Sequence, residues 1–304
     1  MTDNTQALVS AVIVTCRRPV DILERAVRSV LAQTHPHMEL LVVNDAPEEK
    51  ELEASVRAML ESFHDERITY LVHEKNAGAC KARNTGIHAS HGSFVALLDD
   101  DDEWLPEKTT RQLTGFTSPE VGLVYSQYYD VENGQKRLYV SGRKSGDLLP
   151  DLLWKNCVGG CSMPMMRREV FDTCGYFDER FRSAQDYDMW IRIARHYQMV
   201  CVDEPLILRH VQSVCITGNN AAKKQGFDLF MEKYADLYVG HNDALNYRYM
   251  DRTKTWLARG CFKDAAETWK KALKAKAFSK YNVLFPAKGL AKYVLKGRRK
   301  THGS

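Results

Sequence analysis

The sequence has few of the features of a secreted or membrane-spanning protein. None of its apolar runs approaches the ~20 residues that a helix needs to cross a bilayer. The N-terminal segment MTDNTQALVS is polar, with neither a basic start nor an apolar stretch, so no signal peptide is expected. The eight cysteines are scattered, and they form neither a CxxC pair nor a Cys/His zinc spacing. These absences predict a cytoplasmic protein with reduced thiols.

Acidic side chains are missing from one end of the chain. Between Lys271 and Ser304 there are ten Lys or Arg and no Asp or Glu. Subtracting these ten from the 43 basic residues of the 304-residue chain leaves 33, against 39 acidic residues. The net charge of +4 therefore combines an acidic body with a strongly basic tail.

The first 130 residues contain short apolar runs that lack the polar/apolar alternation of a half-exposed strand. Helix-period segments separate them, which predicts a parallel sheet covered by helices on both faces. The expected strands are 10–15, 39–45, 68–73, 93–98 and 121–126. The expected helices are 21–31 with Asp21 as N-cap, 51–63, 79–90 and 106–116.

The pattern loosens from about residue 127 and becomes wholly helical beyond about 220. A turn is expected at Asn133-Gly134, a helix at 186–197, and two short strands at 199–204 and 206–211 that continue the sheet. The chain is therefore expected to divide at residue 218 into an α/β domain and a helical extension.

Five acids in the segment FVALLDDDDEWLP stand directly after the apolar run 94–98. Neighbouring carboxylates repel each other by ~1 kcal/mol per pair in water. Such a cluster either forms a solvated loop or binds a hard divalent cation through oxygen. Ligands of parallel α/β sheets bind beyond the carboxyl ends of the strands, where Thr15, Arg17 and Asp45 are also expected. Their convergence favours a cation that bridges carboxylates to a substrate phosphate.

Five blocks of sequence carry a family resemblance. They are VSAVIVTCRRP, LLVVNDA, NAGACKARNTGI, FVALLDDDDEWLPEK and GYFDERFRSAQDYDMWIRIA. In this order they resemble glycosyltransferase family 2, over about residues 8 to 215. The resemblance implies an inverting enzyme with the GT-A fold that uses a nucleotide-activated sugar. It also implies a nucleotide-binding half at about 8–130 and an acceptor half at about 131–218, followed by a helical extension at 219–304.

The resemblance assigns donor-binding roles to several strand ends. Thr15, Arg17 and Asp45 match positions that contact the nucleotide base and ribose. The family's DxD element falls on Asp99, Asp100 and Asp101, with Asp100 at the ribose position and Asp101 at the position that binds Mn²⁺ or Mg²⁺.

Three further positions keep two readings each. Asp102 matches a common extra acid of the family and is expected to be a helix-start residue beside Pro106 rather than a ligand. Arg83 occupies the place of a basic residue that either contacts the donor or pairs with the acids. His210 falls near a position where a histidine completes the metal site in some relatives; otherwise it is a structural residue.

The second carboxylate that inverting transfer requires is expected at Asp186, in RSAQDYDMW. The matching family pattern is Glu-Asp-x-Asp, whose first Asp acts as the base, and here Gln185 replaces the Glu. A capping role at the helix start is the alternative for Asp186. Asp188 is expected to point elsewhere on the helix.

The basic tail carries Lys288, Lys292 and Lys296 at i, i+4 spacing, downstream of an interruption at Pro286. Either it docks on the anionic inner face of a membrane, as suits a lipid-linked acceptor, or it packs on the catalytic domain. The acidic body argues against nucleic acid as a partner.

The resemblance favours a UDP-sugar as donor, and a glycan or lipid-linked acceptor in cell-envelope polysaccharide synthesis. Two alternatives remain open: a sugar nucleotidyltransferase, and a non-catalytic scaffold with the same fold. The first class has a glycine-rich loop after its first strand, whereas this chain has CRRPVD.

Overall fold

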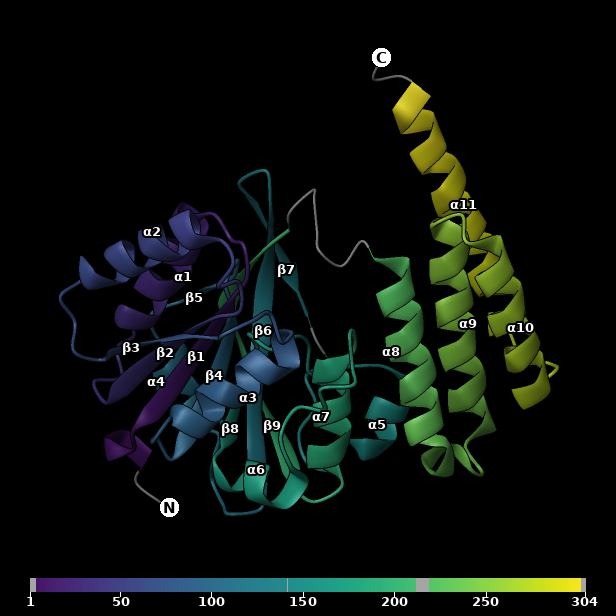
Figure 1. Cartoon of the computed structure of the whole chain (residues 1–304). Coiled ribbons are helices and arrows are strands. Elements are labelled where there is room, and N and C mark those ends of the chain that lie inside the picture. The colour runs from purple at the N-terminus through teal and green to yellow at the C-terminus, as the bar shows by residue number, and fades with distance from the viewer. Residues whose placement is uncertain (1–3, 141, 212–218, 302–304) are drawn as a thin grey trace. The chain divides into compact units, whose positions relative to one another are not determined.

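The computed structural model describes residues 4–140, 142–211 and 219–301 (Figure 1). The chain divides into two units by backbone contacts. The α/β unit combines Met1–Leu149 with Cys157–Phe230, and the helical unit combines Pro150–Asn156 with Met231–Ser304. The expected boundary at residue 218 lies outside the described residues and stays a prediction.

Four parallel strands form one half of the sheet, in the order β3-β2-β1-β4. They are β1 (Val9–Thr15), β2 (Met38–Asn44), β3 (Ile68–Val72) and β4 (Phe94–Asp99), and each agrees with an expected strand to within one residue at either end. The register pairs Thr15 with Asn44 and Val14 with Asp99. The polar residues that follow β1, β2 and β4 therefore meet at one edge of the sheet, as predicted.

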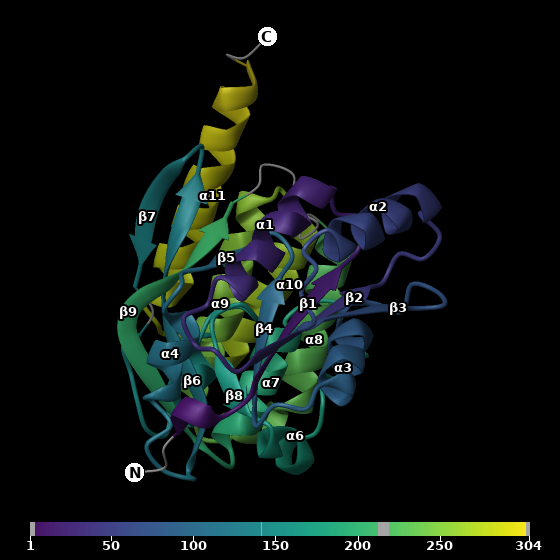
Figure 2. The same ribbon diagram turned by 90° about the vertical axis from the view of Figure 1, so that its left-hand side faces the viewer.

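Both faces of this half are covered, which explains why its strands lack alternation. On one face, Val9, Ala11 and Ile13 belong to a core shared with helices α1 (Val20–Leu31) and α2 (Lys50–Glu61). On the other face lies α3 (Ala79–Ala89), where Gly86 comes so close that a Cβ would be 2.4 Å from Val12. Figure 2 shows α1 and α2 on the side of the strands opposite α3.

The other half of the sheet is mixed. Its strands are β5 (Glu103–Trp104), β6 (Val121–Glu132), β7 (Gln135–Tyr139), β8 (Met165–Arg167) and β9 (Gln198–His210). β8 runs antiparallel to both β4 and β6, while β9 runs parallel to β6. The two strands expected at 199–204 and 206–211 are one strand, β9, because an irregular register between Val202 and Pro205 lets the chain pass the proline.

The remaining helices of the α/β unit are short. They are α4 (Lys108–Leu113), α6 (Glu169–Cys174) and α7 (Gln185–Ala194), together with a 3-10 turn at Asn4–Gln6. The expectation for Asp21 is wrong: Pro19 is the N-cap of α1, and Asp21 lies in the first turn. No disulfide bond joins cysteines of the described part of the chain.

The helical unit is built around α9 (Asn242–Ala258). Its other helices are α10 (Phe262–Ala275) and α11 (Tyr281–Thr301), with a 3-10 turn at Ala235–Tyr238, while α5 (Leu149–Trp154) and α8 (Asn220–Lys233) each begin in the α/β unit. Asn246 of α9 donates to the carbonyl of Ala272 at 2.9 Å and to the side chain of Asn282 at 2.8 Å, which ties α10 and α11 to α9.

Pro286 does not interrupt the tail, because α11 runs through it, contrary to the expectation. An interior proline removes one backbone hydrogen bond, and the neighbouring Phe285 anchors this part of α11 in a buried cluster with Met250 and Ala272. Among the described helices, none is both long and apolar enough to cross a bilayer.

Candidate active site

The acidic run forms a tight turn between β4 and β5. The turn closes through the amide of Asp102, which donates to the carbonyl of Asp99 at 3.0 Å. The Asp99 and Asp101 side chains are 39% and 26% exposed, whereas Asp100 and Asp102 are buried. Two carboxylates of the turn therefore reach solvent, and the other two are held inside.

Arg18 neutralises the middle of the turn. Its guanidinium lies 2.8 Å from an oxygen of Asp100 and 3.1 Å from one of Asp101. Burial raises the pKa of both carboxyls, and Arg18 opposes that rise. A hydrogen bond from Thr15 also lowers the pKa of Asp100, which places this expected donor-binding residue beside the turn.

Sequence analysis singled out Arg17 and overlooked Arg18. Arg17 is 55% exposed along its side chain and pairs with Glu48 and Glu49 instead of the acidic turn. The reason is local: Arg17 has a φ of 54°, a left-handed conformation. This turn of the backbone directs Arg18 to the acids and leaves Arg17 at the surface.

Asp102 is not at a helix start, and that expectation is wrong, because α4 begins only at Lys108. The Asp102 carboxylate instead accepts a hydrogen bond from the Ser162 hydroxyl at 2.6 Å, and the same hydroxyl accepts from the Asp99 amide at 3.1 Å. Burial, with Asp99 nearby, raises the pKa of Asp102 well above its ordinary range. Ser162 thus clamps both ends of the turn, a role that nothing in its apolar sequence context revealed.

Asp45 is buried and fully engaged. Its carboxylate accepts the backbone amides of Ala77 and Gly78, both at 2.8 Å, and the Nδ1 of His73 lies 2.8 Å away. These contacts fix the loop that leads into α3, the helix that carries Arg83. Direct contact of Asp45 with the nucleotide stays a prediction; its visible role is to organise that loop.

Arg83 links the acidic turn to Asp186. One terminal nitrogen of its buried side chain donates to Asp99 Oδ1 at 2.7 Å. The other, Nη1, is buried with no hydrogen-bond partner among the described residues. Both Arg83 and Asp99 act on the charge of Asp186, so the structure brings these three groups together.

Asp186 lies in the first turn of α7 and is half-buried. Burial raises its pKa to about 6, with a further rise from Asp99, while the Tyr187 amide and Arg83 lower it. The Tyr187 amide donates to its carboxylate at 2.8 Å. A carboxylate with this pKa is suited to act as a general base near neutral pH. Asp188 does point elsewhere, as expected: it is fully buried and pairs with Arg192 at 3.1 Å.

His210 ends β9 at a distance from the central acids. Its Nε2 lies 3.2 Å from Glu103, which Arg25 also faces at 4.0 Å. Burial lowers the pKa of His210, and Arg25 adds to this effect. Arg25 in turn donates to the Asp101 carbonyl at 2.9 Å. The metal role of His210 stays a prediction.

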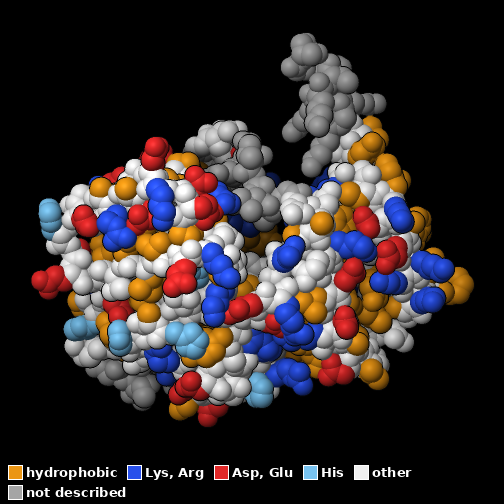
Figure 3. Space-filling model, in the orientation of Figure 1, with side chains coloured by type: hydrophobic (Ala, Val, Ile, Leu, Met, Phe, Trp, Pro, Cys, Tyr) orange, Lys and Arg blue, Asp and Glu red, His pale blue; other side chains and the backbone are white. Residues whose placement is uncertain are grey.

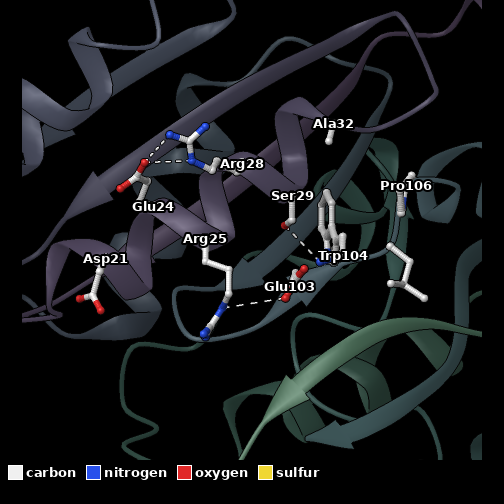
Figure 4. Close-up of a pocket in the computed structure, with 10 residues that line it drawn as sticks. Asp21, Glu24, Arg25, Arg28, Ser29, Ala32, Glu103, Trp104 and Pro106 are labelled. Atoms are coloured by element: carbon white, nitrogen blue, oxygen red, sulfur yellow. Dashed lines mark hydrogen bonds and ion pairs between the residues drawn. The ribbon is translucent and has the colours of Figure 1, made fainter. Parts of the chain in front are cut away.

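An open pocket of about 510 Å³ lies on the α1 side of the acidic turn (Figure 4). Figure 4 shows Arg25 reaching toward Glu103, and Ser29 under the Trp104 amide, which donates to it at 3.1 Å. The lining of the pocket combines side chains of α1 with Glu103 and Trp104 of β5, so the pocket borders the strand that follows the acidic turn.

A divalent cation fits this donor set only in part. In the part of the chain that the structure describes, no group of three or more His, Cys, Asp or Glu side chains converges as a ready cation site. The exposed carboxylates of Asp99 and Asp101 nevertheless offer hard oxygen ligands. Mg²⁺ commonly binds through one or two carboxylates and completes its shell with water and substrate phosphates. The acidic turn fits that mode of binding.

The fold is the GT-A fold, as comparison with solved structures shows. The likeness to S. aureus TarS in complex with UDP-GlcNAc covers 97% of this chain and 92% of that one, with a TM-score of 0.69 and 15% identity. The mannosyltransferase PcManGT from Pyrobaculum calidifontis, solved with GDP-Man and Mn²⁺, gives a TM-score of 0.61 and 18% identity over 97% of this chain and 82% of that one. At such identities the likeness establishes the fold alone.

The family follows from the sequence itself. The family model of glycosyl transferase family 2 matches residues 10–175, more than half of the chain. The protein therefore belongs to this family, as its five sequence blocks predicted, and it is a glycosyltransferase.

Two curated relatives illustrate the family. A Bacillus subtilis glycosyltransferase, TuaG, provisionally named for teichuronic acid biosynthesis, is 30% identical over 68% of this chain and 81% of its own. The Escherichia coli enzyme WfgD, named as a UDP-Glc:α-D-GlcNAc-diphosphoundecaprenol β-1,3-glucosyltransferase, is 29% identical over 57% of this chain and 64% of its own.

Proposed function

We propose that this protein is a divalent-cation-dependent, inverting transferase that moves a sugar from a nucleotide sugar to an acceptor hydroxyl. The observation that carries the proposal is the cluster of Asp99, Arg83 and Asp186: Arg83 donates to Asp99 at 2.7 Å, and both groups act electrostatically on the half-buried Asp186 carboxylate, whose pKa is about 6. Donor and base would then lie on two sides of one sugar, as in-line displacement requires.

In the proposed reaction the acceptor oxygen forms a bond to the anomeric carbon while the bond to the diphosphate breaks. Asp186 takes the proton of the acceptor hydroxyl, which must come within ~3 Å of the carboxylate. The leaving nucleoside diphosphate departs with the electron pair. Arg83 orients Asp99, and its Nη1 is buried with no hydrogen-bond partner among the described residues, so we propose that the bound donor supplies one.

Asp101, with Asp99 beside it, would hold Mn²⁺ or Mg²⁺. Such an ion supplies Lewis-acid stabilisation of the charge that develops on the leaving diphosphate. Thr15 and Asp100 lie beside this position and are proposed to contact the nucleotide, with Arg17 at the rim and Asp45 behind the loop.

The finer assignments draw on the relatives. Complexes of TarS with UDP-GlcNAc and of PcManGT with GDP-Man and Mn²⁺ support a nucleotide-sugar donor and a cation. The names of TuaG and WfgD support a UDP-sugar, a glycan or lipid-linked acceptor and a place in cell-envelope polysaccharide synthesis. Such a reaction would take place in the cytoplasm, at the inner face of the membrane.

Substitution of Asp186 tests the assignment of the base. Asp186→Asn should reduce sugar transfer by about a thousandfold while nucleotide-sugar binding, followed by thermal shift with Mn²⁺, is retained. Asp172→Asn, an exposed carboxylate on α6, is the matched control and should leave transfer unchanged. Undiminished transfer by Asp186→Asn would overturn the assignment, and failure to bind any nucleotide sugar would favour the scaffold reading.

A further inference from the structure

The helical unit exposes a row of apolar side chains along α10. Its members are spaced i, i+4, i+7 and i+11, which places them on one side of the helix: Phe262, Ala266, Trp269 and Leu273. Phe262 is 48% exposed, Trp269 39% and Leu273 43%. The side that faces α9 is a different one, with Ala265, Thr268 and Ala272 buried. Packing within the unit therefore does not account for this row.

A second row with the same spacing runs along α11. It consists of Val283, Ala287, Leu290 and Val294, with Val283 76% exposed and Leu290 45% exposed. The side of α11 toward α9 is again different: a Cβ on Gly289 would be 2.7 Å from the Lys254 carbonyl of α9.

The two rows belong to one surface. α10 and α11 both pack on α9 and run antiparallel to each other. Asn246 of α9 contacts Ala272 near the end of α10 and Asn282 near the start of α11. At the other end, Phe262 at the start of α10 meets Tyr293 of α11, with ring centroids 5.3 Å apart. Phe262, in the first row, thus lies against the side of α11 next to the second row. The connection between the helices exposes Phe278 as well, by 93%. The apolar face is defined as these two rows together with Phe278.

Basic side chains border the apolar face. Lys263, Lys270 and Lys274 are exposed on α10, about a quarter turn from its apolar row by helical geometry. Figure 3 shows basic and hydrophobic side chains side by side over this unit. No acidic residue occurs between Lys271 and the end of the chain. A surface of exposed Trp, Phe, Leu and Val beside lysines differs from the core of a protein interface, where lysine is depleted.

We propose that the apolar face of α10 and α11 docks on an anionic phospholipid surface, with its apolar side chains in the headgroup–acyl boundary and Lys263, Lys270 and Lys274 on the phosphates. The inference concerns a surface separate from the sugar-transfer site and does not depend on it. It extends the membrane contact considered for the tail to α10, on which sequence analysis placed none, and it assigns the contact on α11 to the apolar row and not to the tail lysines.

Trp269 provides a direct test. The other tryptophans are less accessible: Trp104, Trp190 and Trp256 are at most 2% exposed, and Trp154 is half-buried. Vesicles of phosphatidylglycerol and phosphatidylcholine with brominated acyl chains should quench tryptophan fluorescence of the full-length protein, and Trp269→Phe should lose that quenching while it still binds. Absence of quenching, or equal quenching in Trp269→Phe, would overturn the proposal.

Sedimentation with the same vesicles separates the contribution of the apolar side chains to binding from that of the lysines. Trp269→Gln combined with Leu290→Gln should weaken binding by about tenfold or more, because it removes apolar area. Val239→Gln, at a 79% exposed valine outside both rows, is the matched control.

A triple variant tests the lysines. Binding should weaken on the order of a hundredfold when Lys263→Gln, Lys270→Gln and Lys274→Gln are combined. The same triple change at Lys50, Lys75 and Lys136, exposed on the α/β unit, should weaken binding far less.

A second copy of the chain is the competing occupant. Sedimentation velocity without lipid should show a monomer whose mass Trp269→Gln does not change. A dimer that this substitution dissociates would overturn the proposal. Thermal unfolding checks that each variant is folded. If a triple variant does not fold, vesicle binding of the single substitution Trp269→Gln still tests the proposal.

Discussion

The two units of the molecule differ in which side chains they bury and which they expose. In the α/β unit, strands β1, β2 and β4 bury most of their apolar residues on both faces, and Asp99, Asp100 and Asp101 of the acidic turn are paired with Arg83 or Arg18. In the helical unit, which is smaller, lie most of the exposed large apolar side chains of the described residues. The α/β unit thus gathers charged side chains at the carboxyl ends of its strands, where sugar transfer is proposed. The helical unit leaves apolar area at its surface, which indicates contact with something outside the chain.

The largest expected effect is a loss of sugar transfer without a loss of vesicle binding, which would separate the roles of the two units. Asp101→Ala should lower transfer by about a thousandfold, because loss of a cation ligand removes several kcal/mol of charge stabilisation. Vesicle binding of the same variant should equal that of wild type, since Asp101 belongs to the α/β unit. Asp172→Ala is the control, and unchanged transfer by Asp101→Ala would refute the cation role.

A pair of glycines permits a matched comparison of the units. A Cβ on Gly226 would be 2.2 Å from the Ser183 carbonyl, three residues before Asp186, and a Cβ on Gly289 would be 2.7 Å from the Lys254 carbonyl. Gly226→Ala and Gly289→Ala should each destabilise the protein by about 1–3 kcal/mol, because backbone must move to admit the methyl group.

The two glycine substitutions should affect different functions. Gly226→Ala should reduce transfer through displacement of the loop before α7, whereas Gly289→Ala should reduce vesicle binding and spare nucleotide-sugar binding. Thermal unfolding, the sugar-transfer assay, and the assays of nucleotide-sugar and vesicle binding measure these effects. Equal loss of both activities in both variants would mean that the units do not have separate roles.

The smallest expected effect concerns pH. Because burial raises the pKa of Asp186 to about 6 from an ordinary 3.8, ionisation is less favourable in the folded state. The contribution of Asp186 to the stability should therefore fall as the pH rises from about 4 to 6, and Asp186→Asn should remove this part of the pH dependence. At pH 8 the variant should be more stable by about 1–2 kcal/mol, reduced from the full shift because the carboxylate is half-buried.

Below about pH 3 the wild type and Asp186→Asn should have the same stability, since the carboxyl is then mostly protonated in both the folded and the unfolded chain. Thermal unfolding across this range measures the difference. A variant that is less stable than wild type at pH 8 would favour the capping role for Asp186 instead of the base.

The sequence predicted much of the α/β unit because its signals are local. The uninterrupted apolar runs, the acids after residue 98 and the helix that begins near Asp186 were all found at the right places. The errors also have physical causes. Asp21 failed as an N-cap because Pro19 already begins the helix, and Asp102 failed as a helix-start residue because Ser162, sixty residues away in sequence, holds it.

By itself, then, the amino-acid sequence determined the order of the four parallel strands and of the helices between them, and also the family, since each depends on residues that are neighbours in the chain. Only the tertiary structure decided that Arg18 rather than Arg17 neutralises the turn, that Ser162 clamps it, and that Asp99, Arg83 and Asp186 act on one another. A pKa and an ion pair depend on distance and burial in space, and these groups come from segments that only folding brings together.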